Sequence, residues 1–227
     1  MRSSVRPLRP AVLALCLLVT PPGAIGSAGA ATLAVTVRDQ SAHPVADAVI
    51  VAVPLQGIPR PKGERPKEVI DQIDKAFVPR VKVIQVGTSI SFPNKDNIRH
   101  HVYSFSQAKK FELPLYKGLP AGPVVFDKPG VVVLGCNIHD WMIAYVYVVE
   151  SPWFGKSERA GEVRIVDLPA GEYDVEAYHP RARDAAEPVR SRVTIGAAEP
   201  AAIELQITLR PAARSSRPPK GAEGEYP

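Results

Sequence analysis

Three side chains that bind metals stand within seven residues in the second half of the chain. Cys136, His139 and Met142 follow one another at C-x2-H-x2-M spacing, and two adjacent histidines, His100 and His101, lie roughly 35 residues upstream. In a type 1 copper site, one Cys and two His bind in a plane and a Met binds weakly along the axis. Zinc takes Cys and His but does not use a thioether, and harder metals need carboxylates. The sequence therefore predicts one type 1 copper ion and a redox role.

The first thirty residues are typical of a cleaved signal peptide. Three arginines open this segment, an apolar run follows over 11–19, and small residues occupy 28–30. This order of basic start, short apolar core and small residues is the signal for secretion. The apolar run is too short to span a bilayer. We expect cleavage before Ala31 and export to a bacterial periplasm, with no membrane span.

The charge of the chain argues against a nucleic-acid partner. The formal net charge is +5, but the leader carries three arginines and no acidic residue, so the mature chain has a net charge of about +2. No run of Lys and Arg interleaved with aromatic residues is present, as a polynucleotide groove would need. No Ser-His-Asp order, paired carboxylates or phosphate loop is found either, so we expect no enzyme activity.

Once the leader is removed, Cys136 is the sole cysteine, because the other one is Cys16. A single cysteine cannot form an internal disulfide, and a free thiol in an oxidising compartment has to be protected. Simple burial as a small apolar residue is the alternative. With His and Met at the +3 and +6 positions, metal ligation explains Cys136 better.

The apolar pattern predicts an all-β protein. The chain contains 24 Pro and 16 Gly, and its apolar residues form short alternating runs between turn signals, a pattern typical of strands. The expected strands are 32–37, 46–53, 81–86, 89–92, 99–105, 124–126, 131–136, 143–149, 161–166, 173–178, 190–195 and 202–209. Residues 57–76 are interpreted as a linker that begins with a Pro-rich stretch, and 69–77 as irregular or strand. Residues 109–118 are interpreted as a longer excursion, and 211–227 as a disordered tail.

The middle of the chain resembles the cupredoxin family. The stretch VKVIQVGTSISFPNKD before a His-Val, and the Gly-Cys-x-x-His-x-x-Met loop before the last strand, carry this resemblance over 77–150. The loop spacing is most similar to amicyanin, and the stretch NKDNIRHHVYSFSQAKKFELPLYKG is similar to exported proteins labelled methylamine-utilisation or plastocyanin-like. The resemblance implies a Greek-key β-sandwich.

The flanking segments resemble a different family. ATLAVTVRDQSAHPVADAVIVAVP and GEVRIVDLPAGEYDVEAYHP are similar to the two ends of a carboxypeptidase-regulatory or transthyretin-like β-sandwich. Neither end has enough strands to be stable alone. We therefore expect one discontinuous small sandwich, formed by 31–56 and 157–210, into which the cupredoxin domain is inserted. The alternative is a single cupredoxin domain with extra edge strands.

The cupredoxin resemblance also implies roles for the site residues. Its first ligand is a His two residues before a Val, which corresponds to His100, while His101 takes a place where the family usually has Asn. Alternation along a strand allows only one of the two to face inward, and His100 is favoured. With Cys136, His139 and Met142 it completes the ligand set. His139 is expected at the surface as the electron port, rimmed by Ile138 and Trp141, although Trp141 fits core packing equally well.

These features predict a periplasmic blue copper protein that carries single electrons between redox partners. A c-type cytochrome or a periplasmic dehydrogenase is the partner that the family suggests. The alternative is a copper-binding and delivery protein without electron transfer, but such carriers usually have Met- and His-rich tracts, and Met142 is the sole Met of the mature chain. A sandwich with a vestigial site is a third reading. His43 and His179, each before a Pro, are expected to be exposed loop residues.

Overall fold

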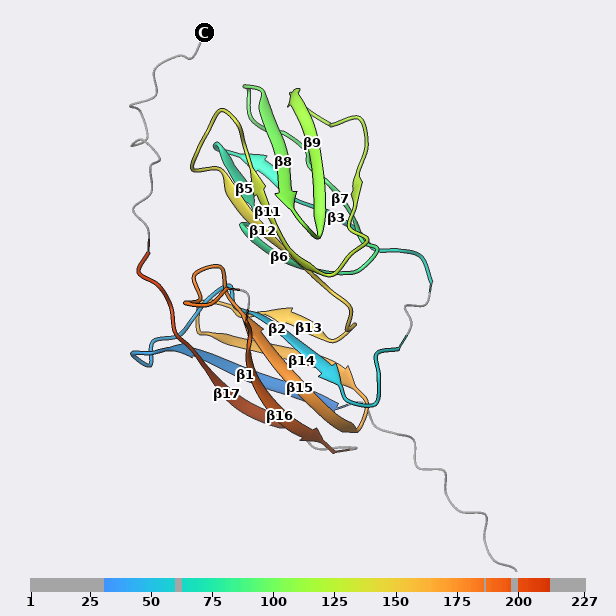
Figure 1. Ribbon diagram of the computed structural model, residues 1–227, viewed down its shortest axis with the longest axis vertical. Coiled ribbons are helices and arrows are strands. Elements are labelled where there is room, and N and C mark those ends of the chain that lie inside the picture. The colour runs from blue at the N-terminus through green and yellow to red at the C-terminus, as the bar shows by residue number, and fades with distance from the viewer. Residues whose placement is uncertain (1–30, 60–62, 186, 197–199, 213–227) are drawn as a thin grey trace, which may run out of the picture.

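The structure is a computed structural model that describes residues 31–59, 63–185, 187–196 and 200–212. The predicted signal peptide and all but two residues of the predicted tail lie outside this part of the chain. The described residues form strands and turns and contain no helix, which confirms the predicted all-β fold. No helix long and apolar enough to cross a membrane occurs among them. Figure 1 shows two stacked bodies, between which the chain passes twice.

The first body, here called the outer sandwich, is made from the two ends of the described chain. Its sheets have the strand orders β14-β1-β17 and β13-β2-β15-β16. Alternating apolar side chains of both sheets meet in one core that includes Leu33, Ile50 and Val175. Its strands are β1 (Ala31–Asp39), β2 (Val49–Pro54), β13 (Phe154–Lys156), β14 (Glu162–Leu168), β15 (Gly171–Tyr178), β16 (Val189–Ile195) and β17 (Ala201–Ile207).

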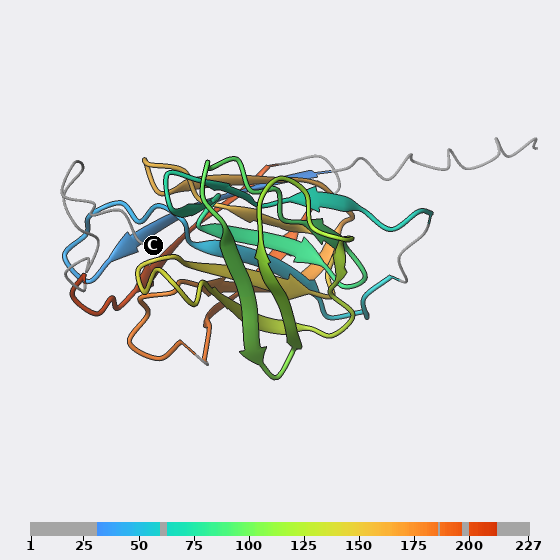
Figure 2. The same ribbon diagram turned by 90° about the horizontal axis from the view of Figure 1, so that it is seen from above.

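The second body, here called the ligand-bearing sandwich, is built from the middle of the chain. A five-stranded sheet of order β6-β12-β11-β8-β9 faces a three-stranded sheet of order β10-β7-β3, and β4 and β5 form a hairpin. Its strands are β3 (Lys67–Val69), β4 (Asp71–Ile73), β5 (Ala76–Val78), β6 (Val81–Gln85), β7 (Ser89–Ser91), β8 (His100–Ser106), β9 (Lys109–Tyr116), β10 (Val124–Val125), β11 (Gly130–Gly135) and β12 (Ile143–Val149). Seen from above, the β8–β9 hairpin runs crosswise to the strands of the outer sandwich beneath it (Figure 2).

The two sandwiches are joined by an apolar contact of their own. Val49 and Val51 of β2 are buried in one cluster with Val81 of β6 and Tyr147 of β12. Strand alternation directs these side chains away from the cores of their own sandwiches. Part of the outer face of the five-stranded sheet is therefore covered by the outer sandwich.

Two sequence interpretations gain detail from the structure. The segment 57–76 contains two short strands, since β3 pairs with β7 and β4 pairs with β5, and β4 lies in the stretch 69–77 that the sequence leaves as irregular or strand. The excursion 109–118 contains β9, which pairs with β8. Pro114 disguises it, but β9 is an edge strand, and an edge tolerates a proline that cannot donate a hydrogen bond.

Candidate metal centre

Two neighbouring strands and one loop bring the predicted ligands together. His100 begins β8 and Cys136 directly follows β11, which lies beside β8 with Gly135 opposite Tyr103. His139 lies in the loop between β11 and β12, and this loop is closed by a hydrogen bond from the Met142 N–H to the His139 carbonyl at 2.9 Å. The ligand positions are therefore set by the strand ladder rather than by the loop alone.

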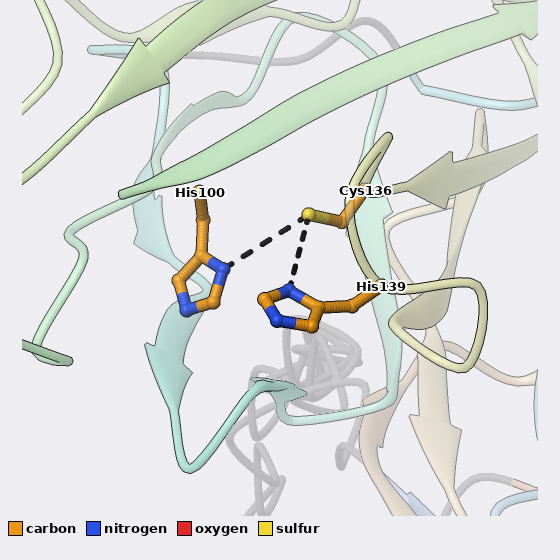
Figure 3. A group of neighbouring side chains, drawn as sticks. All are labelled: His100, Cys136 and His139. Carbon is orange, nitrogen blue, oxygen red and sulfur yellow. Dashed lines mark hydrogen bonds between the residues drawn. The ribbon is translucent and has the colours of Figure 1, made fainter. Parts of the chain in front are cut away.

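Three donor atoms converge in a buried space at the end of the sheet. Cys136 Sγ lies 4.0 Å from His100 Nδ1 and 3.8 Å from His139 Nδ1, and both rings direct that nitrogen toward the sulfur (Figure 3). The three atoms lie within 4.8 Å of one another, and all three residues are buried. Donors that share an ion at ligand bonds of 2.0–2.3 Å stand roughly 3.5–3.8 Å apart. The residues therefore fit a metal bound between them with little movement.

Met142 lies in the same part of the core. It is buried in the apolar cluster that also contains Cys136 and Leu134, and it directly precedes β12. A thioether is a weak ligand that needs no charge compensation. Met142 is thus buried in the same core cluster as the thiol.

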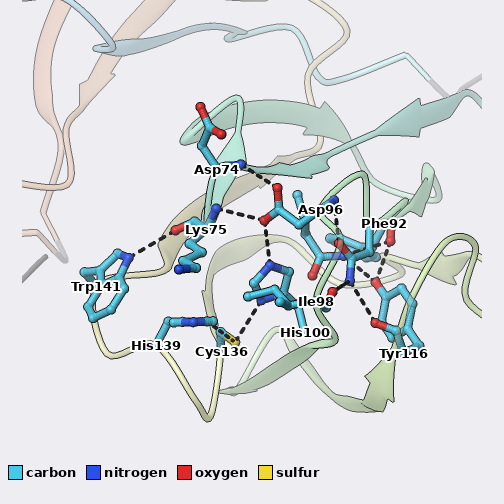
Figure 4. A network of polar contacts seen from close by, with 12 residues as sticks. Asp74, Lys75, Phe92, Asp96, Ile98, His100, Tyr116, Cys136, His139 and Trp141 are labelled. Carbon is cyan, nitrogen blue, oxygen red and sulfur yellow. Dashed lines mark hydrogen bonds and ion pairs between the residues drawn. The ribbon is translucent and has the colours of Figure 1, made fainter. Parts of the chain in front are cut away.

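Asp96 is a site residue that the sequence analysis missed. Its Oδ2 lies 2.7 Å from His100 Nε2, on the far side of the ring from Cys136 (Figure 4). A carboxylate that accepts a hydrogen bond from Nε2–H leaves Nδ1 unprotonated and turned toward the thiol, and such partners fix the tautomer and orientation of metal-binding histidines. Its signal in the sequence is weak, since Asp96 stands in the turn-like stretch NKDN, where a carboxylate is expected to be solvated.

The β4–β5 hairpin braces both imidazoles. Its turn residues, Asp74 and Lys75, have φ values of 53° and 56°, the conformation of a type I′ turn. Both turn N–H groups donate to the Asp96 carboxylate, at 2.7 and 2.8 Å. The Lys75 carbonyl accepts a hydrogen bond from Trp141 Nε1 at 3.2 Å, and the Trp141 ring contacts the His139 ring at 5.1 Å. One turn thus supports His100 through Asp96 and His139 through Trp141.

A second set of hydrogen bonds holds the loop that carries Asp96. Asn94 Nδ2 donates to the carbonyls of Ile98 and Tyr116 at 2.9 and 2.8 Å, and Asn94 Oδ1 accepts from the Asp96 N–H at 3.0 Å. The Tyr116 hydroxyl in turn donates to the Phe92 carbonyl (Figure 4). Because Asn94 is buried, these bonds also satisfy a polar group inside the core.

The electrostatics of the site favour a thiolate. Burial opposes charge on Cys136, but the His100 imidazole and the backbone N–H groups of His101 and Ile138 outweigh it and lower the pKa of the Cys136 thiol. Burial likewise disfavours a charged His100, but Cys136 and Asp96 raise the pKa of its imidazole. For Asp96, burial is outweighed by the Lys75 N–H and by His100, and the pKa of the carboxyl is lowered. A thiolate is the form that binds metals.

The second histidine of the pair lies elsewhere. His101 points to the opposite face of β8, where its Nε2 lies 2.9 Å from Glu112 Oε1, and it does not belong to the three-residue cluster. Its backbone N–H is one of the groups that lower the pKa of the Cys136 thiol. The structure thus brings His100, not His101, to Cys136.

One expectation about the site is wrong. His139 was predicted at the surface, but its side chain is only 3% exposed. Trp141, which the sequence left between rim and core, is half-buried against its ring. Because the β4–β5 turn holds Trp141 in this position, the loop is closed over the imidazole.

Comparisons with known proteins found likenesses to solved structures alone. No protein-family model matches the chain, and no curated protein sequence matches it significantly. A copper-containing nitrite reductase from Thermus scotoductus SA-01 is 25% identical over 43% of this chain and 25% of its own, with a TM-score of 0.36. A purple cupredoxin from Nitrosopumilus maritimus is 24% identical over 36% of this chain and 98% of its own, with a TM-score of 0.32. A reduced amicyanin variant is 18% identical over 45% of this chain and 99% of its own, with a TM-score of 0.34. The matched part spans a quarter of the nitrite reductase, and nearly all of the two smaller proteins.

Proposed function

We propose that this protein is an exported cupredoxin that carries single electrons on one type 1 copper ion. The observation that carries this proposal is the convergence of one thiol and two imidazole Nδ1 atoms in a buried space. Cys136, His100 and His139 would hold the ion, and Met142 would contact it weakly along the axis. Copper in such a set would supply a one-electron couple whose potential is tuned by the axial ligand and by the groups around the sulfur.

The chain contributes rigidity and exclusion of water. Electron carriers work best when both oxidation states share one geometry, so the ligands must be held without the metal's help. The Asp96–His100 contact and the Trp141–Lys75 hydrogen bond fix the two imidazoles from opposite sides of the β4–β5 turn. Burial of all three donors keeps water from adding as a further ligand. This bracing favours an electron carrier over a delivery protein, whose ligands have to let the metal go.

The wider setting is also proposed. Residues 1–30 would direct export to the periplasm and be removed. The outer sandwich and the ligand-bearing sandwich would be two domains, the second inserted in the first, since their sheets share no strand. A redox protein, such as a c-type cytochrome or a periplasmic dehydrogenase, would be the partner, and the chain itself would not be an enzyme.

The test is spectroelectrochemistry of the copper-loaded protein together with a copper-transfer assay. An electron carrier is expected to cycle reversibly between two oxidation states and to keep its copper when mixed with a metal-free acceptor protein. Rapid release of Cu(I) to that acceptor, or an irreversible couple, would contradict electron carriage and support delivery.

A further inference from the structure

The outer face of the five-stranded sheet continues past the contact with the outer sandwich as an exposed apolar surface. We call this surface the sheet-face patch and define it as Tyr103, Phe105, Val133 and Ile143. Phe105 is 77% exposed, Val133 42% and Ile143 38%. Gly135 pairs with both Tyr103 and Ile143, and the same antiparallel register places Val133 beside Phe105. The patch is therefore contiguous across β8, β11 and β12.

The patch is continuous with an interface that the molecule already uses. Val133 pairs with Tyr145, which packs against the buried cluster between the two sandwiches together with Val131. One half of the same sheet face is thus covered by the outer sandwich and the other half is open. Its charged side chains, Lys110 and Glu112, lie at the rim on the edge strand β9.

The patch lies directly outside the sulfur ligand. Gly135 precedes Cys136, and a Cβ at Gly135 would lie 2.7 Å from Tyr103 Cζ, so the ring rests on bare backbone at this residue. The rings of His101 and Tyr103 are 5.4 Å apart, and those of Tyr103 and Phe105 are 5.1 Å apart. Packed rings therefore lead from His101, which follows the ligand His100, to the exposed Phe105.

On the imidazole side of the site, the described residues cover the ring. His139 is buried beneath Trp141, whose Nε1 is bonded to Lys75. Ile138 is the exposed apolar residue of this loop. Electron coupling falls steeply with the width of an intervening gap, so a partner docked on the sheet face would meet the better-packed route.

We propose that the sheet-face patch is the docking site of a redox protein, and that the electron passes through it along Cys136, Gly135 and Tyr103. This inference rests on the proposed function. The partner would present an apolar surface around the edge of its cofactor, because the patch has no charge at its centre. One electron moves from the reduced site to the oxidised cofactor of the partner, and no bond is made or broken. Such encounters use small interfaces that separate quickly.

The test is electron self-exchange between the Cu(I) and Cu(II) forms of the full mature protein, measured by NMR line broadening. The second copy serves as the probe, since it can exchange electrons at any face. Phe105→Ser is expected to slow self-exchange at least tenfold, with the optical band and potential unchanged. The matched control is Leu119→Ser, which removes an apolar residue of the same 77% exposure and is expected to change the rate less than twofold.

Several outcomes would overturn the inference. Slowing by Ile138→Ser but not by Phe105→Ser would place the port at the ligand loop, and equal slowing by Phe105→Ser and Leu119→Ser would show a general surface effect. Wild-type exchange too slow to broaden the lines would argue against any open port. A stable dimer in sedimentation, split by Phe105→Asp, would make the patch a contact between copies. Each of these outcomes overturns only the docking inference if the protein still shows a thiolate-to-copper band. A protein that shows no such band would refute the proposed function itself.

Discussion

The two sandwiches differ most in the polar groups that they bury. Among the described residues, the core of the ligand-bearing sandwich contains Gln72, Asn94, His100, Ser104 and His139. The described part of the outer sandwich buries fewer polar residues, which are Ser151, Ser157 and His179, together with Tyr173, whose hydroxyl donates to the Pro169 carbonyl. Its charged groups pair on the surface, as Arg190 with Glu176 and Arg192 with Asp174.

This difference separates a scaffold from a site. Burying a polar group costs free energy unless it is hydrogen-bonded. The outer sandwich buries few such groups, and its Ser157 hydroxyl donates to the Val45 carbonyl and accepts from the Ala48 N–H. In the ligand-bearing sandwich, Asn94, Asp96 and His100 are polar groups whose hydrogen bonds hold the His100 ring in place. Burial of polar groups thus marks where the fold is constrained by chemistry as well as by packing.

The largest expected effects come from opening a cavity in each core. Leu33→Ala in the outer sandwich and Leu134→Ala in the ligand-bearing sandwich each remove a fully buried side chain and are expected to cost about 2–5 kcal/mol of unfolding free energy. Copper affinity should fall in Leu134→Ala, since Leu134 leads into Cys136, and stay unchanged in folded Leu33→Ala. Urea unfolding and competition with a copper chelator measure the two quantities. Equal loss of affinity in both variants would show that the sandwiches do not act separately.

A smaller effect is expected from the partner of His100. Asp96→Asn removes the carboxylate while keeping its shape, and loss of such a partner typically weakens metal binding 10–100-fold. Asp174→Asn, in a surface pair of the outer sandwich, serves as the control and should leave affinity unchanged. In the metal-free protein, ¹⁵N NMR of the His100 ring should also show a mixed tautomer in Asp96→Asn. A single Nε2–H tautomer in that variant would mean that Asp96 does not position His100.

A pH effect is expected from a histidine outside the site. His179 is buried, not exposed as predicted, because it packs under the β15 end of the outer sandwich, whereas His43 is exposed. Burial is the largest cause that lowers the pKa of His179, and the positive charges of Arg181 and Arg80 add to it. The Ala46 backbone and Asp47 raise the pKa, but by less. Below a pH of about 6.5, His179 is therefore protonated in the unfolded chain but stays neutral in the folded chain. The free energy of unfolding falls as the pH drops through this range, by at most about 1.4 kcal/mol per pH unit.

His179→Gln should flatten this dependence. Urea unfolding of the metal-free wild type and variant between pH 7 and pH 5 measures the difference in slope, and contributions from other groups cancel in the comparison. Parallel slopes for the two proteins would show that His179 does not titrate differently on folding.

What the sequence revealed of the site was its local part. Cys136, His139 and Met142 could be identified from their spacing because one short loop contains all three. His100 could be chosen over His101 because strand alternation places the two side chains on opposite faces. The hydrogen bonds that support His100 could not be predicted from the sequence, because Asp96 meets the turn at Asp74 and Lys75 only in the folded chain. The burial of His139 was missed for the same reason, since it depends on the distant Lys75 carbonyl that holds Trp141.

The fold was predictable to a similar degree. Alternating apolar runs predicted most strands, because each has one face in a core. The short strands β3 and β4 and the edge strand β9 are held by their neighbours rather than by their own pattern, and Pro114 in β9 even argues against a strand. The β4–β5 hairpin that braces the site lies almost entirely within the segment 57–76, which the sequence assigned to a linker.

The most direct test of the central claim is the optical and EPR spectrum of the mature protein after addition of one equivalent of Cu(II). The structure predicts an intense thiolate-to-copper band and a narrow copper hyperfine splitting. Both should be lost in Cys136→Ala and His100→Ala and kept in His101→Ala, because His101 faces Glu112 instead of the thiol. A colourless protein, or a band that survives His100→Ala and disappears in His101→Ala, would contradict the site described here.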